Sequence, residues 1–260
     1  MLTPPIPVVL PLVAAALLAS VHRIVPRWLA ALIAVFTALV VACVAVSMVV
    51  YARDAALVVY WFGGASTHGG HVERLAFVID DSSAMLVLLA GILSAMAMIF
   101  GFRAFGADAR FYAWALVFLG AASGLCVAGD VLTLFMCFAA VVAAAIVLCG
   151  ACRFRAVNWG GGVLMALGIA LLYARTGAMN EASAGRALGS GDGRALAAFA
   201  LIAGGLLVNA AIVPFHFWLA DAVYAAPPAV AALVAGMTVE LALRRDAHLL
   251  GDLRGRAAAL

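Results

Sequence analysis

Long apolar runs separated by short charged turns are the feature that most restricts the fold of this chain. No charged residue occurs from Trp28 to Tyr51 or from Phe111 to Gly129. A helix needs about 20 consecutive apolar residues to cross the hydrocarbon core of a bilayer. Hydrophobic residues make up 68% of the chain and charged residues only 10%, whereas soluble domains average about 25% charged residues. The sequence therefore predicts an all-α integral membrane protein and excludes a soluble enzyme.

The apolar runs predict about eight transmembrane helices, with charges, glycines and prolines as their limits. The expected spans cover residues 6–21, 28–51, 81–102, 111–128, 131–151, 157–173, 195–219 and 226–243. Between the second and third spans, residues 55–79 combine two β-prone runs with a Gly- and His-rich turn. This pattern predicts a β-hairpin or an ordered loop outside the bilayer core.

Four segments follow from these spans. We expect an N-terminal transmembrane hairpin over residues 1–54, the extramembrane hairpin over 55–79, a helical repeat over 80–243 and a polar tail over 244–260. Within the repeat, residues 175–194 are rich in Gly, Ser and charge, which is typical of a surface loop.

The positions of the arginines weakly indicate how the chain is oriented across the membrane. The chain has no lysine, and the first, third and fifth loops are short and carry two arginines each, namely Arg23 and Arg27, Arg103 and Arg110, and Arg153 and Arg155. The positive-inside rule then places the N-terminus outside. The longer loops and the pair Arg244-Arg245 favour the opposite orientation. The arginines form no basic stripe with aromatic residues, so we expect no nucleic-acid partner.

The segment from Asn209 to Asp221 carries the strongest functional signal. Pro214 lacks an N–H group and should break or kink the seventh span. Irregular backbone inside a membrane persists only where protein or water covers it. His216 follows the break, and its charge can change near neutral pH. Two interpretations fit equally: a hydrated pocket at mid-membrane, or a kinked helix whose histidine bonds a neighbouring carbonyl.

Several carboxylates fall within or beside the spans. A charge at the bilayer centre costs at least about 2.5–3.5 kcal/mol, so Glu240 is either functional or close enough to the helix end to reach water beside Arg244. The other carboxylates stand at expected helix ends, where capping is the better explanation. They are Asp80, Asp81, Asp130 and Asp221, of which Asp130 is kept as an ion-pathway candidate.

The stretch from Pro214 to Met237 reads PFHFWLADAVYAAPPAVAALVAGM. It resembles the antiporter-like subunits of respiratory complex I, membrane-bound hydrogenases and Mrp-type Na⁺/H⁺ antiporters. Its residues are most similar to those of the Mrp D subunit. Further matches occur at Ile79-Asp80, at 128–135, and at Tyr173, Thr176, Gly177 and Asn180. The resemblance covers about residues 75–243 and implies the N-terminal half of that fold, with the seventh helix broken near Pro214.

The same resemblance implies a proton relay whose charged residues are altered here. The Glu of the family's fifth span falls at Ala139, the Lys of the seventh at Asn209, and the Lys of the eighth at Glu240. Family members have about fourteen spans in two inverted repeats, so the second repeat is expected to be missing from this chain. His216, Glu240, Asn209 and Asp130 are the remaining candidates for an ion pathway. We expect His216 and Glu240 to face the protein interior rather than lipid, because a charge exposed to lipid is costly.

Three functional hypotheses follow. The first is a divergent antiporter-like subunit of a proton- or cation-translocating complex, with an impaired ion relay. We expect such a subunit to cross a bacterial inner membrane several times and to contact other membrane subunits of the complex. The second is a structural or assembly subunit that does not transport. The third is a truncated fragment of a longer subunit. In each case we expect no catalytic centre, cofactor or metal in this chain; at most it is a subunit of an NADH:quinone oxidoreductase- or hydrogenase-like complex. The spacing of Cys149 and Cys152 fits helix packing better than a metal site.

Overall fold

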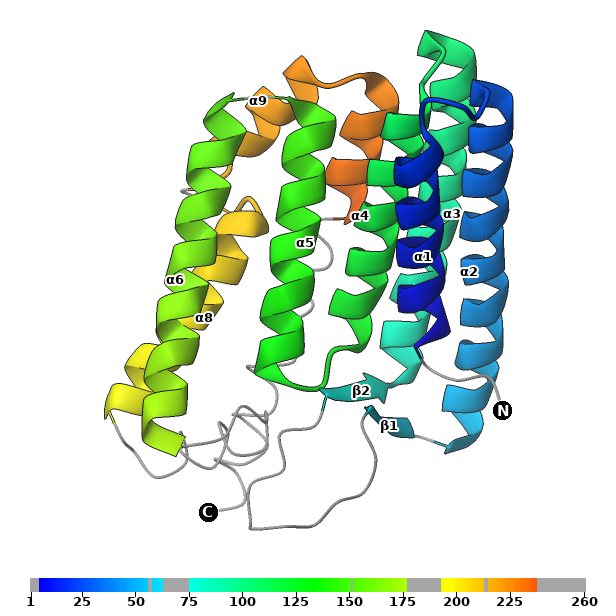
Figure 1. Ribbon diagram of the computed structural model, residues 1–260. Coiled ribbons are helices and arrows are strands. Elements are labelled where there is room, and N and C mark those ends of the chain that lie inside the picture. Colours follow the sequence, from blue (N-terminus) through cyan, green and yellow to red (C-terminus); the bar gives the residue numbers. More distant parts are fainter. Residues whose placement is uncertain are drawn as a thin grey trace.

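The computed structural model describes residues 5–55, 58–62, 75–150, 152–176, 193–212 and 215–237. Helices packed side by side form most of this part of the chain, with a two-stranded sheet at one end (Figure 1). The elements are α1 (Ile6–Val21), α2 (Arg27–Ala55), β1 (Val58–Phe62), β2 (Leu75–Ile79), α3 (Asp81–Phe105), α4 (Ala109–Val127), α5 (Val131–Cys149), α6 (Cys152–Thr176), α8 (Gly193–Asn209), α9 (Phe217–Ala225) and a last helix over Pro228–Met237.

Each of the eight predicted spans corresponds to an apolar helix, but these helices differ in length. Five of the described helices, α2 to α6, are long and apolar enough to cross a membrane. Three are shorter within the described residues: α1, α8 and the Pro228–Met237 helix. With 16 residues, α1 is about 24 Å long at 1.5 Å per residue, less than the ~30 Å hydrocarbon core. The described residues therefore contain five full-length candidate spans rather than eight.

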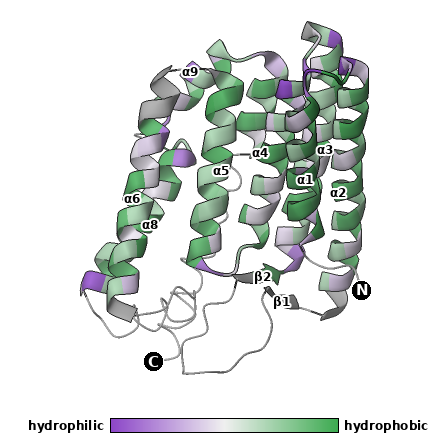
Figure 2. Ribbon diagram, viewed as in Figure 1, coloured by the Kyte–Doolittle hydropathy of each residue, from purple (hydrophilic) through white to green (hydrophobic). Residues whose placement is uncertain are grey.

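Hydrophobic residues extend along the lengths of the helices, and hydrophilic residues gather mainly at their ends (Figure 2). This distribution is the one expected where the middle of a helix lies in lipid and its ends reach water. Together with the candidate spans, it defines a multi-pass membrane protein.

The predicted hairpin is confirmed. Strands β1 and β2 pair antiparallel, with Val58 opposite Ile79 and Phe62 opposite Leu75. An isolated bridge joins Phe77 to Ala128, at the turn between α4 and α5. The hairpin therefore lies against the ends of the helices, where backbone groups that it leaves unpaired can reach water.

Aspartates begin three of the long helices. Asp80 accepts the Ser83 N–H at 3.0 Å and Ser83 Oγ accepts the Asp80 N–H at 2.9 Å, a reciprocal capping box at the start of α3. Asp108 caps α4 by accepting the Phe111 N–H at 3.0 Å. Such caps pair N–H groups that have no partner within the helix. Capping at Asp80 is thus confirmed.

Small residues allow the helices to approach closely. A Cβ added at Gly91 of α3 would lie 3.0 Å from the Cβ of Ala42 in α2. A Cβ at Gly120 of α4 would lie 3.1 Å from the Val8 carbonyl oxygen of α1. In lipid, helix association depends on van der Waals packing, and close backbone approach increases that contact.

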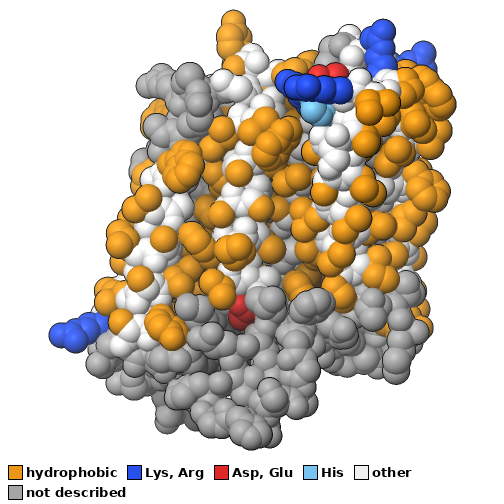
Figure 3. Space-filling model, viewed as in Figure 1, with side chains coloured by type: hydrophobic (Ala, Val, Ile, Leu, Met, Phe, Trp, Pro, Cys, Tyr) orange, Lys and Arg blue, Asp and Glu red, His pale blue; other side chains and the backbone are white. Residues whose placement is uncertain are grey.

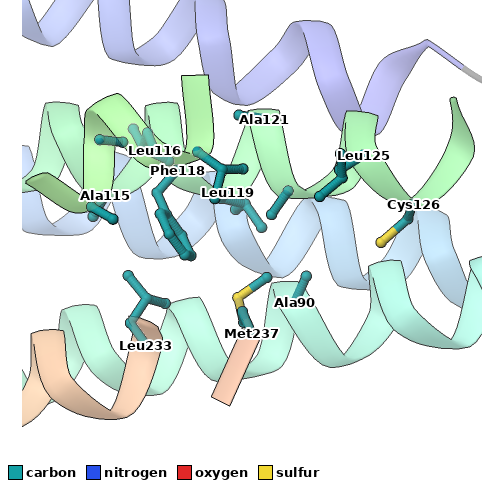
Figure 4. Close-up of a cluster of buried hydrophobic side chains, with 14 of the residues drawn as sticks. Ala90, Ala115, Leu116, Phe118, Leu119, Ala121, Leu125, Cys126, Leu233 and Met237 are labelled. Carbon is teal, nitrogen blue, oxygen red and sulfur yellow. The ribbon is translucent and has the colours of Figure 1, made fainter. Parts of the chain in front are cut away.

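The Pro228–Met237 helix packs on elements far from it in sequence. Leu233 and Met237 extend towards Phe118 and Leu119 of α4, and all four side chains are buried (Figure 4). The Met237 sulfur also lies 4.0 Å from Ser94 Oγ of α3. After the break in the seventh span, the chain therefore returns to the core formed by α3 and α4.

Candidate functional site

The seventh span is interrupted, as the sequence predicts. Helix α8 ends at Asn209 and α9 begins at Phe217. Pro214 itself lies outside the described residues, but its position explains where α8 ends. A proline cannot donate to the carbonyl four residues earlier, and its ring clashes with that carbonyl, which here belongs to Ala210. Ala211 has a φ of 54°, a left-handed conformation that costs a non-glycine residue about 1–2 kcal/mol.

Trp218 holds the two sides of the break together. Its indole Nε1–H donates to the carbonyl oxygen of Val208 at 2.7 Å, and the side chain is buried. Val208 lies in the last turn of α8, where carbonyls have no partner within the helix. Trp218 was not among the residues predicted to be functional. Its role could have been inferred from the sequence, because the N–H group of a buried indole usually finds a hydrogen-bond acceptor.

We expect Trp218→Phe to lower the free energy of unfolding by about 1 kcal/mol, because the ring stays buried while its hydrogen bond is lost. Unfolding in mixed detergent micelles measures this difference. The control is Trp159→Phe on α6, where the indole is 66% exposed, and we expect that change to stay within about 0.5 kcal/mol. Equal effects of the two substitutions would show that the indole does not hold the break.

Asn209 is the last residue of α8, and its side chain is only 1% exposed. Neither its Oδ1 nor its Nδ2 has a hydrogen-bond partner among the residues that the structure describes. Leaving a buried polar group unpaired costs about 1–3 kcal/mol. The structure therefore places a neutral, unsatisfied amide where the resemblance expects a lysine.

A second buried asparagine stands on the neighbouring helix. Helices α6 and α8 touch at Gly161 and Gly205: a Cβ at Gly161 would lie 3.1 Å from the Gly205 carbonyl oxygen. Asn158 is buried three residues before Gly161, and Asn209 is four residues after Gly205. Because α6 and α8 run antiparallel, these offsets place the two asparagines at the same level of the bundle.

His216 differs from its prediction. We expected its ring to face the protein interior, but the side chain is exposed. The ring lies 4.2 Å from that of Phe217, centroid to centroid, at the start of α9. The indole of Trp218, rather than the imidazole, donates to a carbonyl at the break, that of Val208. Expecting His216 to face inwards was wrong for this chain, because the bend turns the first residues of α9 away from the core.

Of two aspartates predicted to cap helices, one does so and the other does not. Asp130 is buried and caps α5, accepting the Thr133 N–H at 2.8 Å and the Thr133 hydroxyl at 2.6 Å. Its capping role is confirmed, and a part in an ion pathway stays a prediction. Asp221 lies inside α9 and not at a helix end, so the prediction that it caps a helix was wrong.

The remaining candidate positions lie apart or outside the described residues. Ala139 is exposed on α5 and belongs to a stripe of exposed residues at helical spacing, Leu132, Met136, Ala139, Ala143 and Val147. Asn209, by contrast, is buried at the end of α8. Glu240, the expected surface loop beyond Thr176 and the polar tail lie outside the described residues.

The apolar helices and the interrupted seventh span together define the class of this protein. It is a multi-pass membrane protein that contains a discontinuous helix. Comparisons with known proteins narrow the class. Residues 128–245 match the family model described as NADH:quinone oxidoreductase/Mrp antiporter, transmembrane. The D subunit of a Na(+)/H(+) antiporter from Alkalihalophilus pseudofirmus is 25% identical, over 65% of this chain and 37% of the relative.

Solved structures are similar to this chain over more of its length. A chain of the membrane-bound sulfane sulfur reductase, an archaeal respiratory membrane complex, matches 100% of this chain and 56% of its own length, with a TM-score of 0.87 at 21% identity. A chain of the Mrp complex from Dietzia sp. matches 96% of this chain and 48% of its own length, with a TM-score of 0.83 at 23% identity. The chain is therefore similar to the antiporter-like membrane subunits of the complex I and Mrp family, in sequence over residues 128–245 and in fold over nearly its whole length. It spans about half the length of these structural relatives, and less of the curated one.

Proposed function

We propose that this chain is a divergent antiporter-like subunit of a proton- or cation-translocating membrane complex, and that its ion relay is impaired. The observation that carries the proposal is the combination of a family fold with altered charge positions. The chain keeps the broken seventh helix, while Ala139, Asn209 and Glu240 stand where the family has Glu, Lys and Lys.

The proposed impairment follows from electrostatics. A carboxylate beside a lysine stabilises the charged ammonium, and displacing either charge releases or takes up a proton. An alanine methyl at position 139 and a neutral amide at position 209 have no charge to exchange.

A structural or assembly role without transport is the second candidate. The unpartnered amide of Asn209 favours it, because a neutral group in a buried position can be retained without any proton traffic. In both cases we expect partner subunits in the same membrane, since the solved relatives are parts of the Mrp complex and of a respiratory membrane complex. A bacterial inner membrane is the proposed location.

Proton flux distinguishes the two candidates. We expect purified protein in liposomes to show slow flux that falls further in Glu240→Gln and in His216→Ala, because these side chains are the titratable groups nearest the break and the middle of the eighth span. A pH-sensitive dye inside the liposomes reports the rate. The control is His22→Ala, at the turn after α1, which should leave the flux unchanged.

Two results would change the proposal. Rapid flux unaffected by either substitution would show that the pathway lies elsewhere. Absence of flux from every version, with folding verified by circular dichroism, would support the structural role instead.

A further inference from the structure

Two turns meet at the end of the bundle opposite the hairpin. Residues 22–26 connect α1 to α2, and residues 106–108 connect α3 to α4 (Figure 1). Gly106 ends α3 with a φ of 59°, a conformation that favours glycine. A Cβ at this position would lie 3.2 Å from Nη1 of Arg27, so the guanidinium rests against the second turn.

Four arginines surround these turns, and we call them the arginine patch: Arg23, Arg27, Arg103 and Arg110. All four are exposed, and none forms an ion pair within the described residues. Asp108 is the single carboxylate in the two turns, and it already accepts the Phe111 N–H at the start of α4. Basic, acidic and histidine side chains gather at this end, above a surface that is mostly hydrophobic (Figure 3).

Helix stability does not explain two of these arginines. Arg27 is the first residue of α2 and Arg110 the second residue of α4. The N-terminus of a helix carries partial positive charge, so a cation there is unfavourable. The same free N–H groups, together with guanidinium groups, favour a bound anion.

The residues beside the patch place it at the surface of the membrane. Ile24 is 84% exposed and Trp28 58% exposed, and Phe102 precedes Arg103 on the outside of α3. Exposed apolar side chains at this level are suited to the upper acyl region, and tryptophan is enriched at the interface with the headgroups. A guanidinium next to such residues lies at the level of lipid phosphates.

We propose that the arginine patch binds the anionic headgroup of a phospholipid. The phosphate accepts hydrogen bonds from the guanidinium groups, while the acyl chains lie along the apolar surfaces below Ile24 and Trp28. This end is also the one that the positive-inside rule places in the cytoplasm, where the leaflet is rich in anionic lipid.

The test is binding of phosphatidylglycerol to the purified full chain in a neutral detergent, measured by native mass spectrometry and by the shift in thermal unfolding. Phosphatidylglycerol should bind and raise the unfolding temperature, whereas phosphatidylcholine and inorganic phosphate should do neither. Each arginine near the surface contributes about fivefold in affinity for anionic lipid. Arg23→Gln and Arg110→Gln should each weaken binding by about that factor, and the double variant by about 25-fold.

Arg194→Gln is the matched control, because Arg194 is exposed at the start of α8, at the opposite end of the bundle. It should leave the affinity unchanged. Equal affinity for phosphatidylglycerol and phosphatidylcholine would overturn the proposal, and so would an equal loss in the Arg194 variant. Stabilisation by inorganic phosphate alone, to the same extent, would overturn the assignment to a lipid.

Discussion

Replacing Gly205 by alanine should destabilise the protein, whereas the same replacement at its neighbour Gly204 should stabilise it. A Cβ at Gly205 would lie 2.6 Å from the Gly161 carbonyl oxygen and 2.9 Å from the Met165 Cβ, so α6 and α8 would have to separate. A Cβ at Gly204 meets no heavy atom within 4 Å. Overpacking costs about 1–3 kcal/mol, and we expect Gly205→Ala near 2 and Gly205→Val at 3 kcal/mol or more.

The stabilisation expected for Gly204→Ala follows from helix propensity. Alanine is favoured over glycine inside a helix by about 0.5–1 kcal/mol, mainly because glycine loses more backbone entropy on folding. Unfolding of both variants in the same mixed micelles gives the two differences directly. If Gly205→Ala proved as stable as Gly204→Ala, the close crossing of α6 and α8 would be wrong.

Replacing Asn209 by lysine should cost at least about 2.5–3.5 kcal/mol, the penalty for a charge in the membrane interior. The side chain is 1% exposed, and the resemblance places the family's Glu at Ala139, which has no charge. A lysine at this position would therefore be buried without the partner that supports it in the family. The measurement is again the free energy of unfolding in mixed micelles.

Asn209→Leu is the matched control, because it keeps the branched shape and the number of side-chain heavy atoms and removes the unsatisfied amide. We expect it to be neutral or to raise stability by up to about 1 kcal/mol, since both of the lost polar atoms have no hydrogen-bond partner. A large loss in Asn209→Leu would show that the amide has a partner after all, such as a buried water. A lysine variant as stable as the native chain would mean that a carboxylate or water lies within reach of position 209.

The sequence predicted much of the local structure. Helix α1 has the predicted limits of 6–21, the β-hairpin lies within 55–79, and the break falls between Asn209 and Phe217. These features depend on interactions over a few residues. Apolar length, aspartate caps and the missing N–H of a proline act within one or two turns of the chain.

The candidate site was predicted less well. The sequence pattern marks the segment around Pro214 and the altered position Asn209, but it places His216 facing inwards and Asp221 at a helix end, and the structure contradicts both. The pattern does not mark Trp218. Which of these side chains reaches the carbonyl of Val208 depends on how the chain bends between α8 and α9 and on how α9 packs against α6 and α5. Neither feature can be read from a short stretch of sequence.

The sequence by itself determined that this chain is a membrane protein of short turns and long apolar helices, interrupted near Pro214. Only the tertiary structure decided which face of each helix is buried. In a soluble protein the hydrophobic pattern marks the buried face, but lipid tails are as apolar as a protein interior, so that pattern gives little information here. The buried faces instead follow close packing, such as Gly161 against Gly205. That packing buries Asn209 at the end of α8, whereas the bend before α9 leaves His216 exposed.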